Sequence, residues 1–119
     1  MAMRSNTNRT ERVRYELKRC IALLLQTEIK DPRVNLVSIT ECVVSKDLKY
    51  AKIYFTVIGD KARVEAALAG LNSARGFIKK RIGESLELRH TPALTFYYDS
   101  SVEYGVNIDQ LLHKVSHEK

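Results

Sequence analysis

The sequence predicts an α+β fold in which helices cover one face of a three-stranded mixed sheet. Three runs have strand character, and helical periodicity occurs before the first run, between the second and third, and after the third. This gives the order α-β-β-α-(kink)-α-β and a C-terminal helix. The chain has 119 residues, enough for one domain with one core. Hydrophobic residues make up 45% and charged residues 29%, a globular rather than a disordered composition.

The first helix is expected over residues 9–29, after a short flexible N-terminus at 1–7. Asn8 and Glu11 have the spacing of a capping box. Pro32 disfavours helix in the residue before it and so ends the element. The apolar residues on one face of this helix are Val13, Leu17, Ile21, Leu24 and Leu25.

Two runs rich in β-branched residues, 36–44 and 50–58, are expected to pair as an antiparallel hairpin. Residues 45–48 between them have turn chemistry. A third strand is expected over 94–98, after the break at Pro92. The apolar face of the second run is Ala51, Ile53, Phe55 and Val57.

A second helical region follows, which Asp60 is placed to cap. Its apolar pattern meets Ala74-Arg75-Gly76 and then resumes, and glycine within a helix costs about 1 kcal/mol relative to alanine, so a kink is expected there. A last helix is expected around 108–115, before a flexible end at 116–119. A hairpin followed by a helical crossover into a third strand is the topology of a type II KH domain.

Charge is unevenly distributed along the chain, whose net charge is +6. Residues 1–33 carry eight Lys/Arg against four Asp/Glu, and residues 75–90 carry five against two. Residues 91–119 carry two against four. Two basic segments and an acidic tail favour a phosphate-binding surface.

The remaining composition favours a cytoplasmic protein. No run of 18 apolar residues is present, and the polar N-terminus lacks the apolar stretch of a secretory signal. Cys20 and Cys42 are far apart, and a chain of this size needs no disulfide, so both are interpreted as reduced thiols.

Short motifs in a fixed order carry a resemblance to a known family. They are Asp31-Pro32-Arg33-Val34, Val37-Ser38-Ile39-Thr40, Asp47-Leu48, Ala51-Lys52-Ile53-Tyr54, Gly59-Asp60, Leu71-Asn72-Ser73-Ala74-Arg75-Gly76-Phe77-Ile78, Leu88-Arg89-His90-Thr91-Pro92, Leu94-Thr95-Phe96 and Asp99. In this order and spacing, the chain resembles the bacterial ribosome-binding factor A family over roughly residues 5–115.

The resemblance implies a single KH-like RNA-binding domain over 1–119, in which Ala74-Arg75-Gly76 replaces the usual GxxG loop. It implies binding to the immature small ribosomal subunit (30S) and its 16S rRNA. It also implies support for late maturation, including processing of the rRNA 5′ end, especially in the cold. We expect no catalytic activity, no cofactor or metal, no small-molecule substrate and no membrane partner. We expect the protein to be a monomer. Some members have a longer charged tail, so any function that depends on such a tail does not follow from this resemblance.

Candidate RNA-binding residues form two basic groups. Glycine lets an RNA backbone come close, and free N–H groups at the start of the next helix attract phosphate. The alternative for both groups is an ordinary solvated helix face, with glycine merely bending the helix. The group around the kink is Ala74, Arg75, Gly76, Lys79, Lys80 and Arg81. The group on the first helix is Arg9, Arg12, Lys18 and Arg19.

Other residues are weaker candidates. Arg33 and Arg89 could each anchor a loop to a carboxylate instead. Base stacking is disfavoured, because tyrosines are ordinary strand formers and a sheet face covered by helices cannot stack bases. The tyrosines in question are Tyr50, Tyr54, Tyr97 and Tyr98.

Enzymatic function is disfavoured as well. His113 and His117 are spaced i, i+4 but form no zinc motif, and neither a P-loop nor a GxGxxG is present. A hydrolase or nuclease would need a metal or carboxylate cluster that the sequence does not show. The alternative to RNA binding is a basic protein-interaction module that binds an acidic protein.

Overall fold

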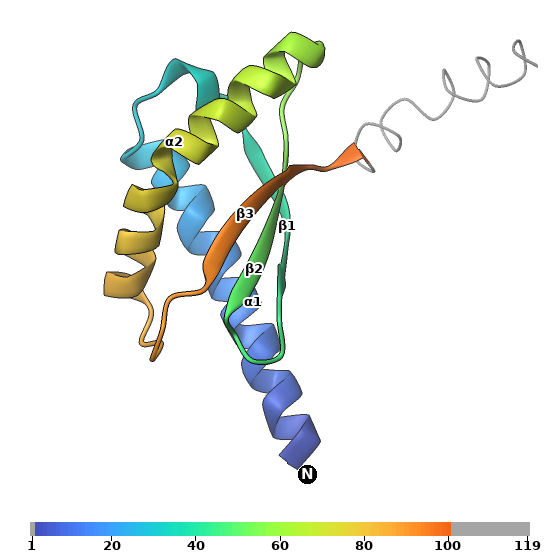
Figure 1. Cartoon of the computed structure of the whole chain (residues 1–119), viewed down its shortest axis with the longest axis vertical. Coiled ribbons are helices and arrows are strands. Elements are labelled where there is room, and N and C mark those ends of the chain that lie inside the picture. Colours follow the sequence, from blue (N-terminus) through green and yellow to red (C-terminus); the bar gives the residue numbers. More distant parts are fainter. Residues whose placement is uncertain (1, 101–119) are drawn as a thin grey trace, which may run out of the picture.

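The computed structural model describes residues 2–100, with side chains from residue 9 onward (Figure 1). The predicted order of elements is confirmed within this range. The helix expected around 108–115 and the chain end at 116–119 lie outside the described residues. The elements are α1 (Ala2–Thr27), the 3-10 turn η1 (Pro32–Val34), β1 (Ser38–Val44), β2 (Tyr50–Thr56), α2 (Lys61–Ser85) and β3 (Ala93–Tyr98).

Helix α1 begins earlier than expected. It runs from Ala2, so the predicted start at residue 9 is wrong and Asn8 lies within the helix. Residues 2–8 contain neither proline nor glycine, so nothing in the sequence stops the helix from extending backward. The predicted end is close to the observed one at Thr27. Asp31 then caps η1 by accepting a hydrogen bond from the Arg33 backbone N–H.

The three strands form one mixed sheet in the order β1-β2-β3. β1 and β2 are antiparallel, and β2 and β3 are parallel, as the hairpin and the helical crossover predicted. Ile53 at the centre lies between Cys42 and Phe96. The register shifts between Ile39 and Glu41, an irregularity that the sequence did not reveal.

The turn between β1 and β2 is held by Asp47. Its carboxylate accepts hydrogen bonds from the Ser45 hydroxyl at 2.7 Å and the Lys49 backbone N–H at 3.0 Å. These bonds favour the charged form and hold the pKa of Asp47 below its ordinary value. The predicted turn chemistry is confirmed.

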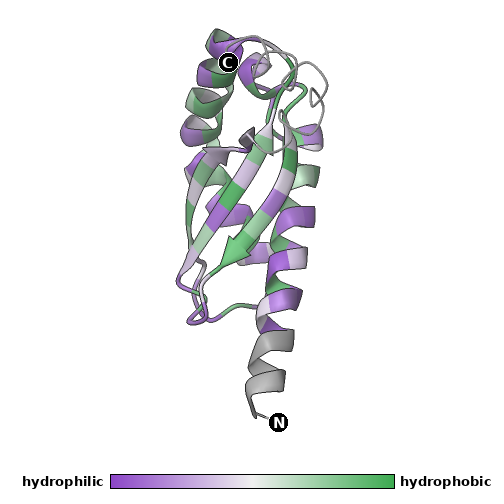
Figure 2. Ribbon diagram, turned by 90° about the vertical axis from the view of Figure 1, so that its right-hand side faces the viewer, coloured by the Kyte–Doolittle hydropathy of each residue, from purple (hydrophilic) through white to green (hydrophobic). Residues whose placement is uncertain are grey.

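One hydrophobic core lies between the sheet and the two helices. The alternation predicted for β2 is confirmed, since Ala51, Ile53, Phe55 and Val57 are all buried. Figure 2 shows hydrophilic and hydrophobic residues alternating along the strands. Cys42 is fully buried, and its burial raises the pKa of the thiol to about 12. Both described cysteines, Cys20 and Cys42, are free thiols.

Helix α2 is continuous from Lys61 to Ser85, with Asp60 as its N-cap as predicted. Figure 1 shows its axis changing direction about midway, so the helix bends without a break. The glycine that packing requires here is Gly70. A Cβ at that position would lie 2.8 Å from Val34 Cγ1, so the absence of a side chain lets α2 approach η1 closely.

Candidate nucleic-acid interface

Four of the predicted residues form an exposed surface on α2. Arg75, Gly76, Lys79 and Lys80 are all exposed, and we call them the bend surface. The pairs Arg75/Lys79 and Gly76/Lys80 are four residues apart and so neighbours on the helix. A Cβ at Gly76 would meet nothing within 4 Å. The bend surface therefore offers bare helix backbone flanked by three cations, while Ala74 beside it packs against the core.

One part of the expected mechanism at the bend is wrong. Because α2 is continuous through Ala74-Arg75-Gly76, no second helix begins there. In a continuous helix each backbone N–H donates to the carbonyl four residues earlier, so the free N–H groups that would attract phosphate are not supplied. Attraction at this site must come from side-chain charge, with Gly76 allowing close approach.

Arg81 differs from its neighbours. It donates to Glu28 at 3.0 Å and to Glu84 at 3.0 Å, and both carboxylates raise its pKa. The Glu28 contact ties the second half of α2 to the end of α1, across 53 residues of sequence. The charge of Arg81 is thus offset by two acidic partners, which favours a structural role over phosphate binding.

The structure divides the predicted cations of α1. Arg9 and Arg12 line one open hollow of about 580 Å³, together with the residues at and after the C-terminus of α2. Arg19 is exposed. Lys18 is half-buried and close enough to Cys42 of β1 for its charge to act on that thiol, so it lies toward the sheet. The four residues therefore do not form a single surface.

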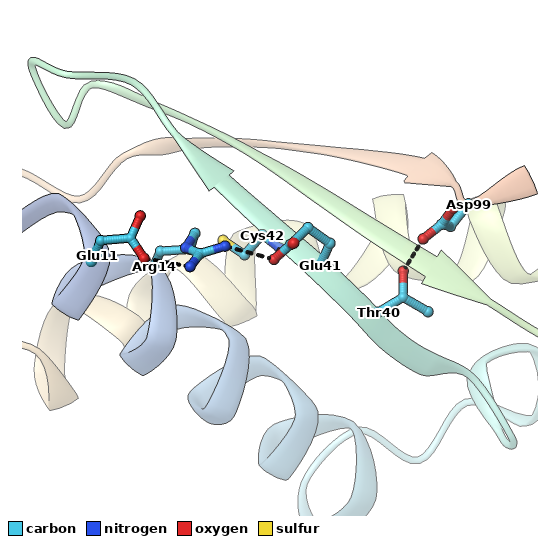
Figure 3. A network of polar contacts seen from close by, with 6 residues as sticks. All are labelled: Glu11, Arg14, Thr40, Glu41, Cys42 and Asp99. Atoms are coloured by element: carbon cyan, nitrogen blue, oxygen red, sulfur yellow. Dashed lines mark hydrogen bonds and ion pairs between the residues drawn. The ribbon is translucent and has the colours of Figure 1, made fainter. Parts of the chain in front are cut away.

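Arg14, which the sequence did not single out, has a structural role. It forms ion pairs with Glu11 on its own helix and, at 3.2 Å, with Glu41 of β1 (Figure 3). Glu41 also accepts a hydrogen bond from the Cys42 backbone N–H. This network fixes α1 against the edge of the sheet and engages Glu41.

A second hollow, of about 290 Å³, is strongly basic. Its only acidic lining residue is Asp47, which already accepts two hydrogen bonds within its turn. Three segments far apart in sequence build it: α1, the β1–β2 turn and the loop after α2. The lining residues are Arg9, Thr10, Lys46, Asp47, Leu48, Lys49, Leu88, Arg89 and His90. We call this site the cationic hollow.

Sequence reasoning found only part of the cationic hollow. Arg9 was a candidate and Arg89 a weaker one, but Lys46 was interpreted only as part of the turn and Lys49 was not considered. The available signal was that both flank the Asp47-Leu48 turn, whose single carboxylate leaves an excess of positive charge. The other weak candidate, Arg33, does anchor its loop, since its guanidinium donates to Asp31 at 2.7 Å.

The expectation that helices cover the sheet face carrying the tyrosines is wrong for three of the four. Tyr50, Tyr54 and Tyr97 alternate with buried residues and lie on the face of the sheet opposite the core. Helices do not cover that face within the described residues. Tyr98 fits the original interpretation, because it packs against the core and meets Phe55 edge-on, with ring centroids 5.9 Å apart.

Two further features of the described residues bear on other functions. Between residues 2 and 100, no three His, Cys, Asp or Glu side chains gather as a metal site would require. No helix in the same part of the chain combines the length and apolar character needed to cross a bilayer. His113 and His117 lie outside the described residues.

Comparison with known sequences gives a consistent family. The family model described as ribosome-binding factor A matches residues 9–112. The chain is 46% identical to ribosome-binding factor A of Acetivibrio thermocellus, over 91% of this chain and 89% of the relative. It is 45% identical to ribosome-binding factor A of Geotalea uraniireducens, over 91% of this chain and 88% of that relative. The protein of Brevibacillus brevis is 40% identical, over 95% and 93%.

Solved structures agree. The crystal structure of ribosome-binding factor A from Thermus thermophilus matches with a TM-score of 0.68 and 25% identity, over 75% of this chain and 93% of that one. The solution structure of a Thermotoga maritima protein, described as a putative ribosome binding factor A, matches with a TM-score of 0.66 and 26% identity. This match covers 75% of this chain and 85% of that one. A homology model of Thermus thermophilus ribosome binding factor A, fitted into a cryo-EM map of its complex with 30S, matches with a TM-score of 0.61 and 25% identity. This match covers 73% of this chain and 91% of that one. With its KH-like topology and basic surfaces, the chain belongs to the ribosome-binding factor A family.

Proposed function

We propose that this protein binds the immature 30S subunit through phosphate groups of its 16S rRNA. The observation that carries the proposal is the cationic hollow, where Arg9, Lys46, Lys49 and Arg89 converge from three segments around one engaged carboxylate. Like charges brought together repel one another unless an anionic partner offsets them. A polyanion with closely spaced phosphates is such a partner.

The bend surface supplies a second set of contacts. No ion pair joins Arg75, Lys79 or Lys80 to a described carboxylate, whereas Arg81, two positions from Lys79, forms two. Exposed cations of this kind bind phosphates mainly by releasing condensed counterions, so affinity falls steeply with salt. Gly76 lets the RNA backbone lie close to the helix, because no side chain projects there.

In this proposal the protein acts as a monomeric cytoplasmic binding protein rather than an enzyme. It holds a conformation of the maturing RNA and is then displaced. Two findings support the partner: the family of the chain, and the Thermus thermophilus relative fitted into a 30S complex. We further propose that binding supports late maturation, including processing of the 16S rRNA 5′ end, most strongly in the cold.

The test is co-sedimentation of the protein with immature and mature 30S subunits. Lys49→Gln and Arg89→Gln each remove one charge from the cationic hollow and should weaken binding to immature subunits. Glu65→Gln on the exposed surface of α2 is a control for altered charge. Unchanged co-sedimentation of both hollow variants would refute the site.

Two further measurements address the alternatives. Binding that survives complete digestion of RNA would favour an acidic protein partner instead. In cells that carry only the hollow variants, unprocessed 16S rRNA 5′ ends should accumulate more at low than at optimal growth temperature, as measured by primer extension. Normal processing at both temperatures would contradict the proposed role in maturation.

A further inference from the structure

The sheet has a second face that the proposed phosphate contacts do not use. Three rows of residues cross it, as the strand register shows: Glu41, Tyr54 and Tyr97; Val43, Lys52 and Thr95; and Tyr50 with Ala93. We call the side chains of Val43, Tyr50, Lys52, Tyr54, Thr95 and Tyr97 the open sheet face.

Aromatic rings are exposed on this face. Tyr50 is 63% exposed and Tyr97 is 42% exposed, while Val43 beside them is 46% exposed. Tyr54 and Tyr97 are neighbours across β2 and β3, with ring centroids 5.6 Å apart and planes inclined by 30°. The two rings therefore form a continuous aromatic surface rather than isolated side chains.

The charges around these rings suit a polyanion. Lys52 is exposed in the central row, next to the aromatic pair. Glu41, the acidic residue in the aromatic row, is engaged by Arg14 and by the Cys42 backbone N–H. The face therefore presents tyrosines and a lysine, and its acidic neighbour is already paired.

The open sheet face begins one residue beyond the cationic hollow along the chain. Lys49 lines the hollow, and Tyr50 directly follows it at the start of β2. Tyr54 lies four residues further along the strand, a distance of roughly 13 Å at about 3.3 Å per residue. A chain held by its phosphates in the hollow could thus continue over Tyr50 toward the Tyr54/Tyr97 pair.

We infer that the open sheet face binds unpaired RNA by stacking bases on Tyr50 and on the Tyr54/Tyr97 pair, with Lys52 contacting the backbone. This inference rests on the proposed function and adds a preference for single strands to it. Exposed aromatic residues on a sheet stack two or three splayed bases in other RNA-binding domains, whereas bases within a duplex remain stacked on each other. The phosphate contacts lack this preference, because duplexes and single strands both offer phosphates.

The test compares oligouridylate with a duplex RNA of equal length at low salt. Tyr97→Ala and Tyr50→Ala should each weaken oligouridylate binding, since the loss of one stacked base lowers affinity by about 5- to 150-fold. Their duplex binding should stay unchanged. Tyr97→Phe keeps the ring and should bind like the wild type. Tyr15→Ala is the matched control, because Tyr15 is 66% exposed on α1, away from the sheet.

A direct readout is available because the chain has six tyrosines and no tryptophan. Oligouridylate should quench tyrosine fluorescence in the wild type, and less so in Tyr50→Ala, whose exposed side chain can be removed without opening the core. Wild-type affinity and quenching in both alanine variants would overturn the inference.

The outcomes separate this inference from the proposed function. If both alanine variants bind oligouridylate normally while Lys49→Gln and Arg89→Gln bind RNA weakly, the stacking face fails and the proposed function stands. If the wild type binds neither RNA nor subunits at low salt, both fail. If the protein dimerises in sedimentation equilibrium and Tyr97→Ala makes it monomeric, the face joins two copies of the chain and the inference is wrong.

Discussion

The contrast between two lysines and the arginine beside them gives a sharp test of the bend surface. Lys79 and Lys80 are exposed, whereas Arg81 is bound to Glu28 and Glu84. The double variant Lys79→Gln/Lys80→Gln removes two free charges, and Arg81→Gln removes one that is already offset. Glutamine is a good helix former, so the helix itself is preserved.

The magnitude follows from counterion release. Each phosphate contact contributes about 0.7 to 0.9 to the slope of log affinity against log salt. Loss of two contacts should reduce the slope by about 1.4 to 1.8, and extrapolation from 1 M to 0.1 M salt gives a loss of affinity of about 25- to 60-fold. Arg81→Gln should leave the slope unchanged and lower the melting temperature, because it removes the link between α2 and α1.

The assay is a salt titration of binding to fluorescently labelled 16S rRNA fragments, by anisotropy between about 50 and 300 mM monovalent salt, the range in which such slopes are measured. Thermal unfolding of the same preparations separates folding from binding. An unchanged slope in the double variant would refute phosphate contact at the bend. An equal reduction in slope for Arg81→Gln would show that its carboxylate partners do not remove it from RNA binding.

Three further outcomes are expected. Gly76→Ala should stabilise the protein by about 1 kcal/mol in urea unfolding, because a new Cβ meets no described atom and alanine favours helix. The same variant should weaken RNA binding, and equal or tighter binding would contradict close approach of RNA at the bend. Gly70→Ala should destabilise the protein by about 1–3 kcal/mol in the same assay, because its Cβ would lie 2.8 Å from Val34; unchanged stability would contradict that packing. The raised pKa of Cys42 means that the folded state holds the thiol proton more tightly than the unfolded state. The contribution of Cys42 to stability should therefore be constant below about pH 9 and fall above it by up to about 1.4 kcal/mol per pH unit toward pH 12, and the Cys42→Ala variant should lose this part of the pH dependence.

Local chemistry explains why the order of elements could be predicted. The alternation in β2 follows from the two-residue period of a strand, and Asp60 caps α2 through a backbone N–H only three residues away. The turn around Asp47 likewise uses groups within two residues. The start of α1 was missed because a capping pattern favours a boundary but does not forbid the helix from continuing past it.

The candidate site was less predictable, because its properties depend on which distant residues meet. The sequence shows a basic run at 79–81, but not that Glu28, 53 residues from Arg81, pairs with it. It shows lysines beside a turn, but not that Arg9 and Arg89 join them in one hollow.

By itself the sequence determined the order of the secondary-structure elements, the buried face of β2, the excess of positive charge and, through its motifs, the family. Those features are encoded within a few residues of chain, where periodicity, capping and composition act. The tertiary structure decided which cations are free, which side of the sheet the tyrosines occupy and where the helix backbone is bare. Such properties arise only when segments far apart in sequence pack together, because packing brings in the partners that offset a charge or cover a ring.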